Sequence, residues 1–146
     1  MGETFKIFLT AGLTILGGVF VYVIGQIISK FMIEPIHEQK KIISEINDNL
    51  IFYANQFYLY TEVNPKAEEI RNKFRSFSAQ LRAKTHLIPF YVLFQKLRMV
   101  LRKEDIYGAC SSLVGLSNSV YKIEGQDISH VESYRNEIST KLKIKL

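Results

Sequence analysis

Residues 7–29 form an uninterrupted run of 23 residues without a charged side chain. As an α-helix this run extends about 35 Å at about 1.5 Å per residue, slightly more than a bilayer hydrocarbon core of about 30 Å. A single segment satisfies its backbone hydrogen bonds in lipid only as a helix, because a closed barrel needs several strands. The run therefore predicts an N-terminal transmembrane helix, to which the rest of the chain is attached.

The run is too long for the apolar region of a cleaved signal peptide, which spans about 7–15 residues, and no small-x-small cleavage site follows it. We therefore expect a single-pass anchor with residues 1–6 as a short tail. Lys6 precedes the anchor, whereas Lys30, Lys40 and Lys41 follow it. Because positive residues stay on the cytoplasmic side, the C-terminal domain is expected to be cytoplasmic.

Pro35 predicts a juxtamembrane break or kink at residues 30–35, because proline lacks a backbone N–H and disfavours helical geometry at the residue before it. From Ile36 to Tyr60, apolar residues recur at spacings of three and four, with Gln39 as the one polar member of the stripe. The same spacing continues to the end of the chain, and we find no strand pattern with hairpin turns. The prediction is an all-α protein: one transmembrane helix, then a small cytoplasmic bundle of four or five helices at residues 36–146.

Four local signals mark the expected helix starts after the first bundle helix: Asn64-Pro65, Pro89, Lys103-Glu104-Asp105 and Ser129-x-x-Glu132. Asparagine and serine cap helices, proline fits the first turn, and acidic residues favour the positive end of the helix dipole. Residues 125–127 are expected to form a turn. The short helix after Pro89 is expected to have a broad apolar face formed by Phe90, Leu93, Phe94, Leu97, Val100 and Leu101.

The sequence offers few residues for catalysis or metal binding. His37, His86 and His130 lie on different expected helices and in no metal-binding spacing. The single cysteine, Cys110, lies on an apolar helix face and is interpreted as a small core residue. No glycine loop for phosphate binding is present outside the apolar run. We therefore predict no cofactor and no enzymatic activity.

Positive charge is concentrated between residues 66 and 103, where ten Lys or Arg face two acidic residues. Seven of these cations form the candidate basic surface: Arg71, Arg75, Arg82, Lys96, Arg98, Arg102 and Lys103. Such a surface is either a solvated face without a partner, a contact for anionic lipid, or a contact for an acidic protein. Nucleic acid is the least favoured partner, because no recognised fold signature is present and the aromatic residues coincide with core stripes.

The apolar run carries small residues near one stripe: Ala11, Thr14, Gly18 and Gly25. Small residues at such spacing let two transmembrane helices approach closely, which predicts self-association. The alternative is that glycine is common in transmembrane helices generally and marks no interface here.

Several short segments resemble a group of short bacterial single-pass membrane proteins of unknown function: residues 33–39 (IEPIHEQ), 50–55 (LIFYAN), 81–83 (LRA), 88–91 (IPFY) and 113–118 (LVGLSN). The resemblance covers nearly the whole chain, although its motifs are not chemically specific. It implies a bacterial cytoplasmic (inner) membrane location and no known catalytic residues.

The resemblance also draws attention to polar residues among apolar helix positions: Tyr53, Asn55, Arg82, Ser117 and Asn118. If buried, they need hydrogen-bond partners, so they form either a structural network between helices or a site for a ligand or partner. The function we predict is that of a membrane-anchored interaction or scaffold protein, with a protein partner or self-association. The alternative is a small membrane-active toxin or immunity component.

Overall fold

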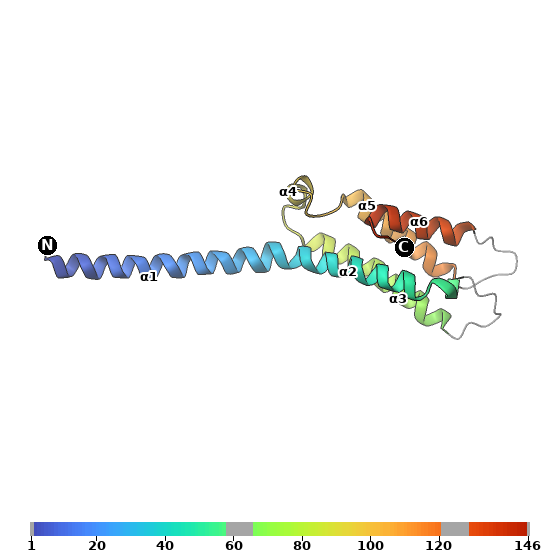
Figure 1. The fold of residues 1–146 in the computed structure, drawn as a ribbon, viewed down its shortest axis with the longest axis horizontal. Coiled ribbons are helices and arrows are strands. Elements are labelled where there is room, and N and C mark those ends of the chain that lie inside the picture. Colours follow the sequence, from blue (N-terminus) through green and yellow to red (C-terminus); the bar gives the residue numbers. More distant parts are fainter. Residues whose placement is uncertain (1, 58–65, 121–128, 146) are drawn as a thin grey trace. The chain divides into compact units, whose positions relative to one another are not determined.

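The computed structural model describes residues 2–57, 66–120 and 129–145, and the chain divides into two units, Met1–Glu34 and Pro35–Leu146. Within the described residues every regular element is helical, which confirms the all-α prediction (Figure 1). The first unit contains α1 (Glu3–Ile28) and a π-helical turn, η1 (Ser29–Ile33). After it come α2 (Glu34–Phe52), the 3₁₀ turn η2 (Ala54–Phe57), α3 (Ala67–Leu87), α4 (Tyr91–Lys96), α5 (Lys103–Asn118) and α6 (Ser129–Leu142).

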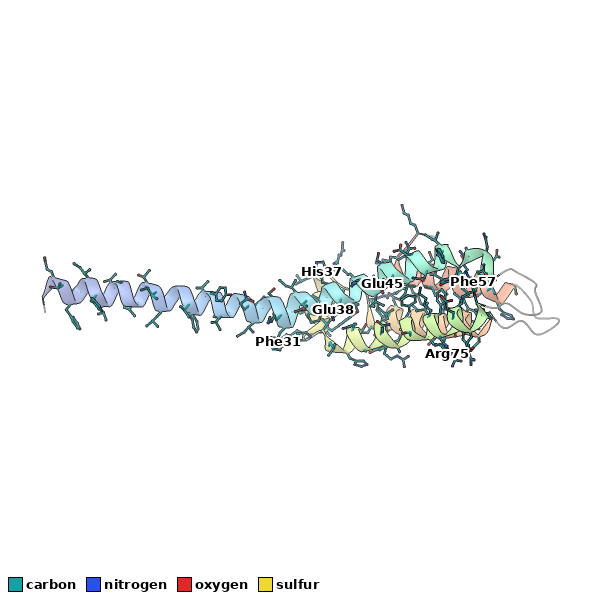
Figure 2. The ribbon with its side chains drawn as sticks, turned by 90° about the horizontal axis from the view of Figure 1, so that it is seen from below. Phe31, His37, Glu38, Glu45, Phe57 and Arg75 are labelled. Atoms are coloured by element: carbon teal, nitrogen blue, oxygen red, sulfur yellow. The ribbon has the colours of Figure 1, made fainter. Side chains whose placement is uncertain are left out.

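Helix α1 is apolar on every side. None of its side chains is buried, and its apolar side chains project all around the ribbon (Figure 2). The hydroxyls of Thr10 and Thr14 donate to the carbonyls of the residues four positions earlier, at 2.8 and 2.9 Å, so these polar groups are satisfied within the helix. By length and composition α1 is capable of crossing a membrane.

The stretch around Pro35 corrects one prediction. Residues 30–35 are not a break in the helix: the Glu34 amide donates to the Ser29 carbonyl five residues earlier, and α2 follows directly. A π-helical turn widens the backbone just before the proline, where a regular turn sets the ring against the carbonyl four residues earlier. Pro35 then occupies the first turn of α2, where its missing N–H is tolerated.

The core of the second unit is built by α2, α3, α5 and α6, which run alongside one another (Figure 1). Ile46, Leu50, Phe74, Leu113 and Ile138 are fully buried there. Within α2, Ile46 and Leu50 are four residues apart, which is the spacing that the sequence predicts for a buried helix face. Each such side chain stabilises the fold by about 1.5–3 kcal/mol through burial of apolar surface.

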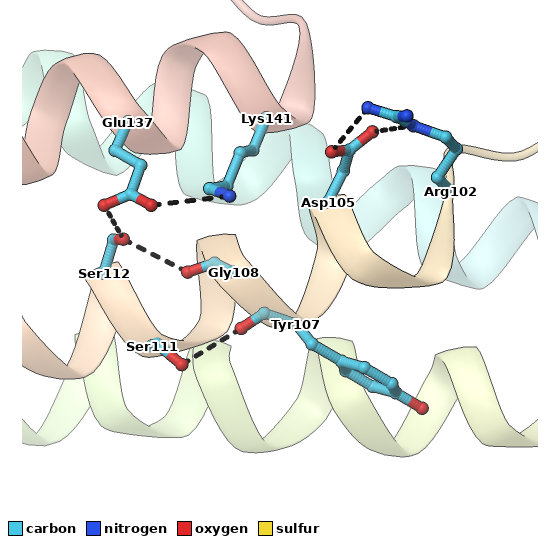
Figure 3. Close-up of polar contacts among 8 residues, drawn as sticks. All are labelled: Arg102, Asp105, Tyr107, Gly108, Ser111, Ser112, Glu137 and Lys141. Carbon is cyan, nitrogen blue, oxygen red and sulfur yellow. Dashed lines mark hydrogen bonds and ion pairs between the residues drawn. The ribbon is translucent and has the colours of Figure 1, made fainter.

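Helix α5 packs against α3 on one side and α6 on the other. Against α6, the Ser112 hydroxyl lies 2.7 Å from Glu137 Oε2 and 3.1 Å from the Gly108 carbonyl, and Lys141 Nζ lies 3.4 Å from Glu137 Oε1 (Figure 3). At Gly115 the two helices are so close that an added Cβ would stand 2.6 Å from Tyr134 ring atoms. The α5–α6 contact therefore depends on glycine.

Helix α5 begins at Lys103, as predicted, and the structure describes α6 from Ser129 onward. The apolar face expected after Pro89 divides in the structure: Phe94 and Val100 are buried, whereas Phe90, Leu93 and Leu97 are exposed. The predictions at Tyr60, at Asn64-Pro65 and at the turn 125–127 lie outside the described residues.

Candidate functional site

A shallow groove of about 740 Å³ lies between α3 and α5, and we call it the α3–α5 groove. It is lined by Arg75, Ser78, Ala79, Arg82, Ala83, His86, Cys110, Ser111 and Val114. None of these lining residues is acidic. The groove is therefore a concave surface with positive charge along one wall.

The wall formed by α3 follows from the amphipathic pattern of that helix. Phe74, Phe77 and Leu81 turn into the core, which leaves Arg75 and Arg82 on the outer side. Arg75 projects from the outer side of α3 in Figure 2. The residues between the two arginines on this face are small, so the groove stays open.

The two arginines are held by neighbouring side chains. The Arg75 guanidinium donates to the Asn118 side-chain oxygen at 2.8 Å and to the Ser117 hydroxyl at 3.4 Å. The Arg82 guanidinium carbon lies 5.5 Å from the centre of the Tyr107 ring, a cation–π distance. Both cations are exposed, so they are positioned for a partner while remaining accessible.

The floor of the groove is closed by two reciprocal hydrogen bonds between α3 and α5. The Ser78 hydroxyl donates to the Cys110 carbonyl at 2.9 Å, and the Cys110 thiol donates to the Ser78 carbonyl at 3.5 Å. Burial raises the pKa of the Cys110 thiol, against the opposing effects of its hydrogen bond with Ser78 and of the nearby Arg82 charge. The thiol therefore stays protonated and is a poor nucleophile.

The five polar residues selected from the sequence do not form one network. Ser117 and Asn118 share Arg75, and Arg82 contacts Tyr107 instead. Two further residues lie apart from these: the Tyr53 hydroxyl donates to Glu69 at 3.2 Å, and Asn55 is exposed on η2.

Arg75 was predicted to be part of the basic surface, but nothing in the sequence indicated that Ser117 and Asn118 contact it. The neighbouring pair His86 and Tyr107, whose Nε2 and hydroxyl lie 3.3 Å apart, was not predicted either. The spacing of seven between Arg75 and Arg82 was the available signal for the groove wall, because it places both on one helix face.

The predicted basic surface likewise divides into separate regions. Arg98 and Arg102 line a second groove of about 720 Å³, together with Lys40 and Lys143. In that groove Arg102 Nε and Nη2 lie 2.8 and 3.2 Å from the two carboxylate oxygens of Asp105, and its hydrogen bond lowers the pKa of this carboxyl (Figure 3).

The remaining members of the predicted surface lie elsewhere. Lys103 Nζ stands 5.0 Å from the centre of the Tyr91 ring, Lys96 is exposed on α4, and Arg71 is half-buried on α3. In the α3–α5 groove, by contrast, the predicted cations Arg75 and Arg82 line a concave surface without an acidic lining residue.

A buried polar cluster lies at the first turns of α2. The Gln39 side chain, 1% exposed, donates from its amide to the Thr85 hydroxyl at 2.8 Å and to the Tyr91 hydroxyl at 3.3 Å. Those hydroxyls in turn donate to the Leu81 carbonyl at 2.7 Å and the Leu101 carbonyl at 2.8 Å. Both hydroxyls therefore accept and donate a hydrogen bond, and the cluster joins α2, α3 and α4.

The small residues Ala11, Thr14, Gly18 and Gly25 are all exposed on α1, and the space beside Gly18 and Gly25 is open. Their role in self-association stays a prediction. In the part of the chain that the structure describes, no three His, Cys, Asp or Glu side chains gather in a way that could hold a metal ion.

No protein family, curated protein or solved structure matches the chain.

Proposed function

We propose that the chain is a membrane-anchored helical interaction protein whose α3–α5 groove binds an acidic helical segment of a partner protein. In this proposal α1 crosses a bacterial cytoplasmic membrane once, and the second unit faces the cytoplasm. The observation that carries the proposal is the acid-free groove with Arg75 and Arg82 held on one wall.

The anchor is supported by the chemistry of α1. An apolar surface on every side of a 26-residue helix is unfavourable in water, whereas lipid is an apolar solvent for it. The lysines after the segment favour a cytoplasmic second unit. Self-association through Ala11, Thr14, Gly18 and Gly25 is part of the same proposal, because their exposed small side chains permit close helix packing.

The partner is argued from charge and shape. Arg75 and Arg82 are seven residues apart, so they stand about 10 Å apart along the axis of α3. A partner helix with two carboxylates seven residues apart matches this distance. Ala79 and Ala83 keep the groove shallow enough for helix axes to approach to about 8–10 Å.

The ion pairs proposed for Arg75 and Arg82 are exposed, so each contributes about 0.2–1 kcal/mol to binding. Together they mainly determine which partner binds. Burial of apolar side chains over Ala79, Ala83 and Val114 supplies the rest of the affinity. Reversing both charges replaces two attractions with two repulsions, so the effect on binding exceeds that of neutralisation.

Site-specific photocrosslinking tests this proposal. Ala83→benzoylphenylalanine is placed in the full chain in its native membranes, and the crosslinked peptide is identified. The expected product maps to an acidic helical segment of one protein and is lost in Arg75→Glu/Arg82→Glu. The matched control is Lys143→Glu/Lys145→Glu, which reverses two exposed cations outside the groove and retains the product. Crosslinks to a segment without acidic residues, or crosslinks that survive reversal of the groove arginines, contradict the proposal.

A further inference from the structure

Residues 87–99, which we call the α4 loop, expose an unusual amount of apolar surface. Six of its large apolar side chains are exposed: Leu87, Phe90, Val92, Leu93, Leu97 and Met99. The other exposed large apolar side chains that the structure describes in the second unit are Ile51, Phe52 and Val114. Exposed apolar patches of this kind mark contacts with proteins or membranes.

The α4 loop is apolar on both of its faces. Tyr91 and Phe94 point inward and are buried, as the core requires. The opposite face carries Val92 and Leu93, where a water-exposed helix carries polar residues. The outer face is therefore matched to an apolar environment.

The shape of the loop is imposed by the fold. Phe90 and Arg98, which bracket α4, both have left-handed backbones, with φ of 49° and 58°, a conformation that bulky residues rarely adopt. After α4, the amides of Arg98 and Met99 donate to the carbonyls of Gln95 and Phe94 at 3.0 and 2.9 Å, which closes the helix end. The backbone conformation at both ends of α4 therefore sets the direction of these apolar side chains.

The charges around the loop select the sign of its partner. From residue 87 to residue 103 the chain has four cations, Lys96, Arg98, Arg102 and Lys103, and no acidic residue. Apolar side chains bordered by cations are typical of segments that enter the interface of an anionic membrane.

The α4 loop lies at the end of the second unit where the chain enters that unit. Gln39, which donates to Tyr91 of α4, is five residues beyond Glu34, where the first unit ends. Glu38 and Lys84 form an ion pair with N–O distance 2.5 Å at the same end. Figure 1 shows α4 at this end of the second unit. The α4 loop is thus close to the point at which the chain enters the second unit.

We propose that the α4 loop inserts into the interfacial region of the lipid bilayer that α1 crosses. Phe90, Val92, Leu93 and Leu97 enter the upper acyl region, and Lys96 and Arg98 contact anionic headgroups. The inference rests on the proposed membrane anchor. It adds a second membrane contact, which fixes the orientation of the second unit on the bilayer surface.

The chain contains no tryptophan, so a single Phe→Trp substitution gives a unique fluorescence signal. Three such variants of the full chain are compared: Phe90→Trp in the α4 loop, Phe52→Trp at the far end of α2, and Phe20→Trp in α1. The three phenylalanines are 73%, 75% and 67% exposed, so they are closely matched. Phe52 lies about 20 Å along α2 from Gln39.

Each variant is reconstituted in vesicles of phosphatidylcholine and phosphatidylglycerol at roughly three to one, an anionic surface, with bromine on the acyl chains as quencher. For Phe90→Trp we expect quenching at least about threefold stronger than for Phe52→Trp, as for an interfacial segment. Bromine near the headgroup end of the acyl chain is expected to quench Phe90→Trp more strongly than bromine near the bilayer centre.

The Phe20→Trp variant separates the two proposals. If it is quenched by bromine near the bilayer centre and Phe90→Trp is not quenched, the anchor holds and the α4 loop proposal is overturned. If Phe90→Trp emission is blue-shifted without lipid quenching, a protein surface covers the loop, which also overturns it. If Phe20→Trp is not quenched, the anchor itself is contradicted. Equal quenching of Phe90→Trp in vesicles of phosphatidylcholine alone removes the role assigned to Lys96 and Arg98.

Discussion

The Gln39 side-chain amide in α2 donates a hydrogen bond to the Tyr91 hydroxyl in α4, with 3.3 Å between the two atoms. Tyr91, the first residue of α4, also donates to the Leu101 carbonyl, which lies between α4 and α5. The contact therefore connects the first turns of α2 to the start of α4 and to the segment that follows it. A polar residue in an apolar stripe thereby connects α2 to α4.

Removing the Gln39 amide is expected to destabilise the second unit. Gln39→Ala leaves the buried Thr85 and Tyr91 hydroxyls without their donor and opens a cavity, at a cost of about 1–3 kcal/mol. The measurement is denaturant unfolding of the full chain in detergent, followed by circular dichroism. Gln80→Ala is the control, because that glutamine contacts Ser76 at an exposed site, and its effect is expected within about 0.5 kcal/mol. Equal effects of the two changes contradict the structural role of Gln39.

Tyr91 predicts an alkaline limit to stability. Burial raises the pKa of its hydroxyl above the ordinary value of 10.0, and Tyr107 and Glu104 act in the same direction, against the hydrogen bond from Gln39. The folded state therefore favours the protonated form, so this contribution to stability is complete below pH 10.0 and is lost as pH rises through the raised pKa. Unfolding midpoints of the full chain are compared with those of Tyr91→Phe from neutral to alkaline pH. The loss above that pH is expected to be smaller in the variant, and parallel profiles contradict the assignment.

The Cys110 thiol is expected to react slowly in the folded protein. It is buried against Ser78, and burial raises its pKa, so little thiolate is present and reagent access is blocked. Alkylation by a maleimide is measured with and without denaturant, and the folded rate is expected to be at least about 100-fold lower, since reaction requires local unfolding. The chain has one cysteine, so the signal is unambiguous. Similar rates in both conditions contradict the packing of α3 against α5.

The two glycines of α5 are expected to respond in opposite ways to alanine. Gly115→Ala sets a Cβ against the Tyr134 ring and is expected to cost about 1–3 kcal/mol of unfolding free energy. For Gly108→Ala, the three atoms nearest to the new Cβ belong to the flexible end of Lys141, and alanine favours the helix by up to about 1 kcal/mol, so this change is expected to be neutral or stabilising. Thermal unfolding of the two variants in one detergent gives the comparison. A Gly115→Ala protein as stable as Gly108→Ala contradicts the close approach of α5 and α6.

Much of the fold was accessible from the sequence because it depends on local patterns. The uncharged run extends over most of α1, and acidic residues near Lys103 marked the start of α5 correctly. Ile46 and Leu50 lie in the core because apolar spacing directly determines which side of a helix is buried.

The failures depend on contacts between distant residues. The π-helical turn before Pro35 depends on how the backbone accommodates a proline ring, and a proline by itself indicates only a disturbance. Nothing local predicts that Arg75 meets Asn118, because 43 positions separate them and only the packing of α3 on α5 brings them together. Similarly, the apolar spacing places Leu93 on the apolar face of its helix, but it does not predict that this side chain is exposed.

The membrane anchor is the claim on which the functional proposal depends, and extraction of membranes at alkaline pH tests it most directly. The full chain is expressed, membranes are washed with sodium carbonate, and the intact mass of the retained protein is determined. We predict that the protein stays in the membrane pellet at its full mass of 16.9 kDa, because in our proposal α1 crosses the membrane and is not cleaved. Release of the protein into the carbonate supernatant, or recovery of a shorter chain cleaved after the apolar run, would contradict the account.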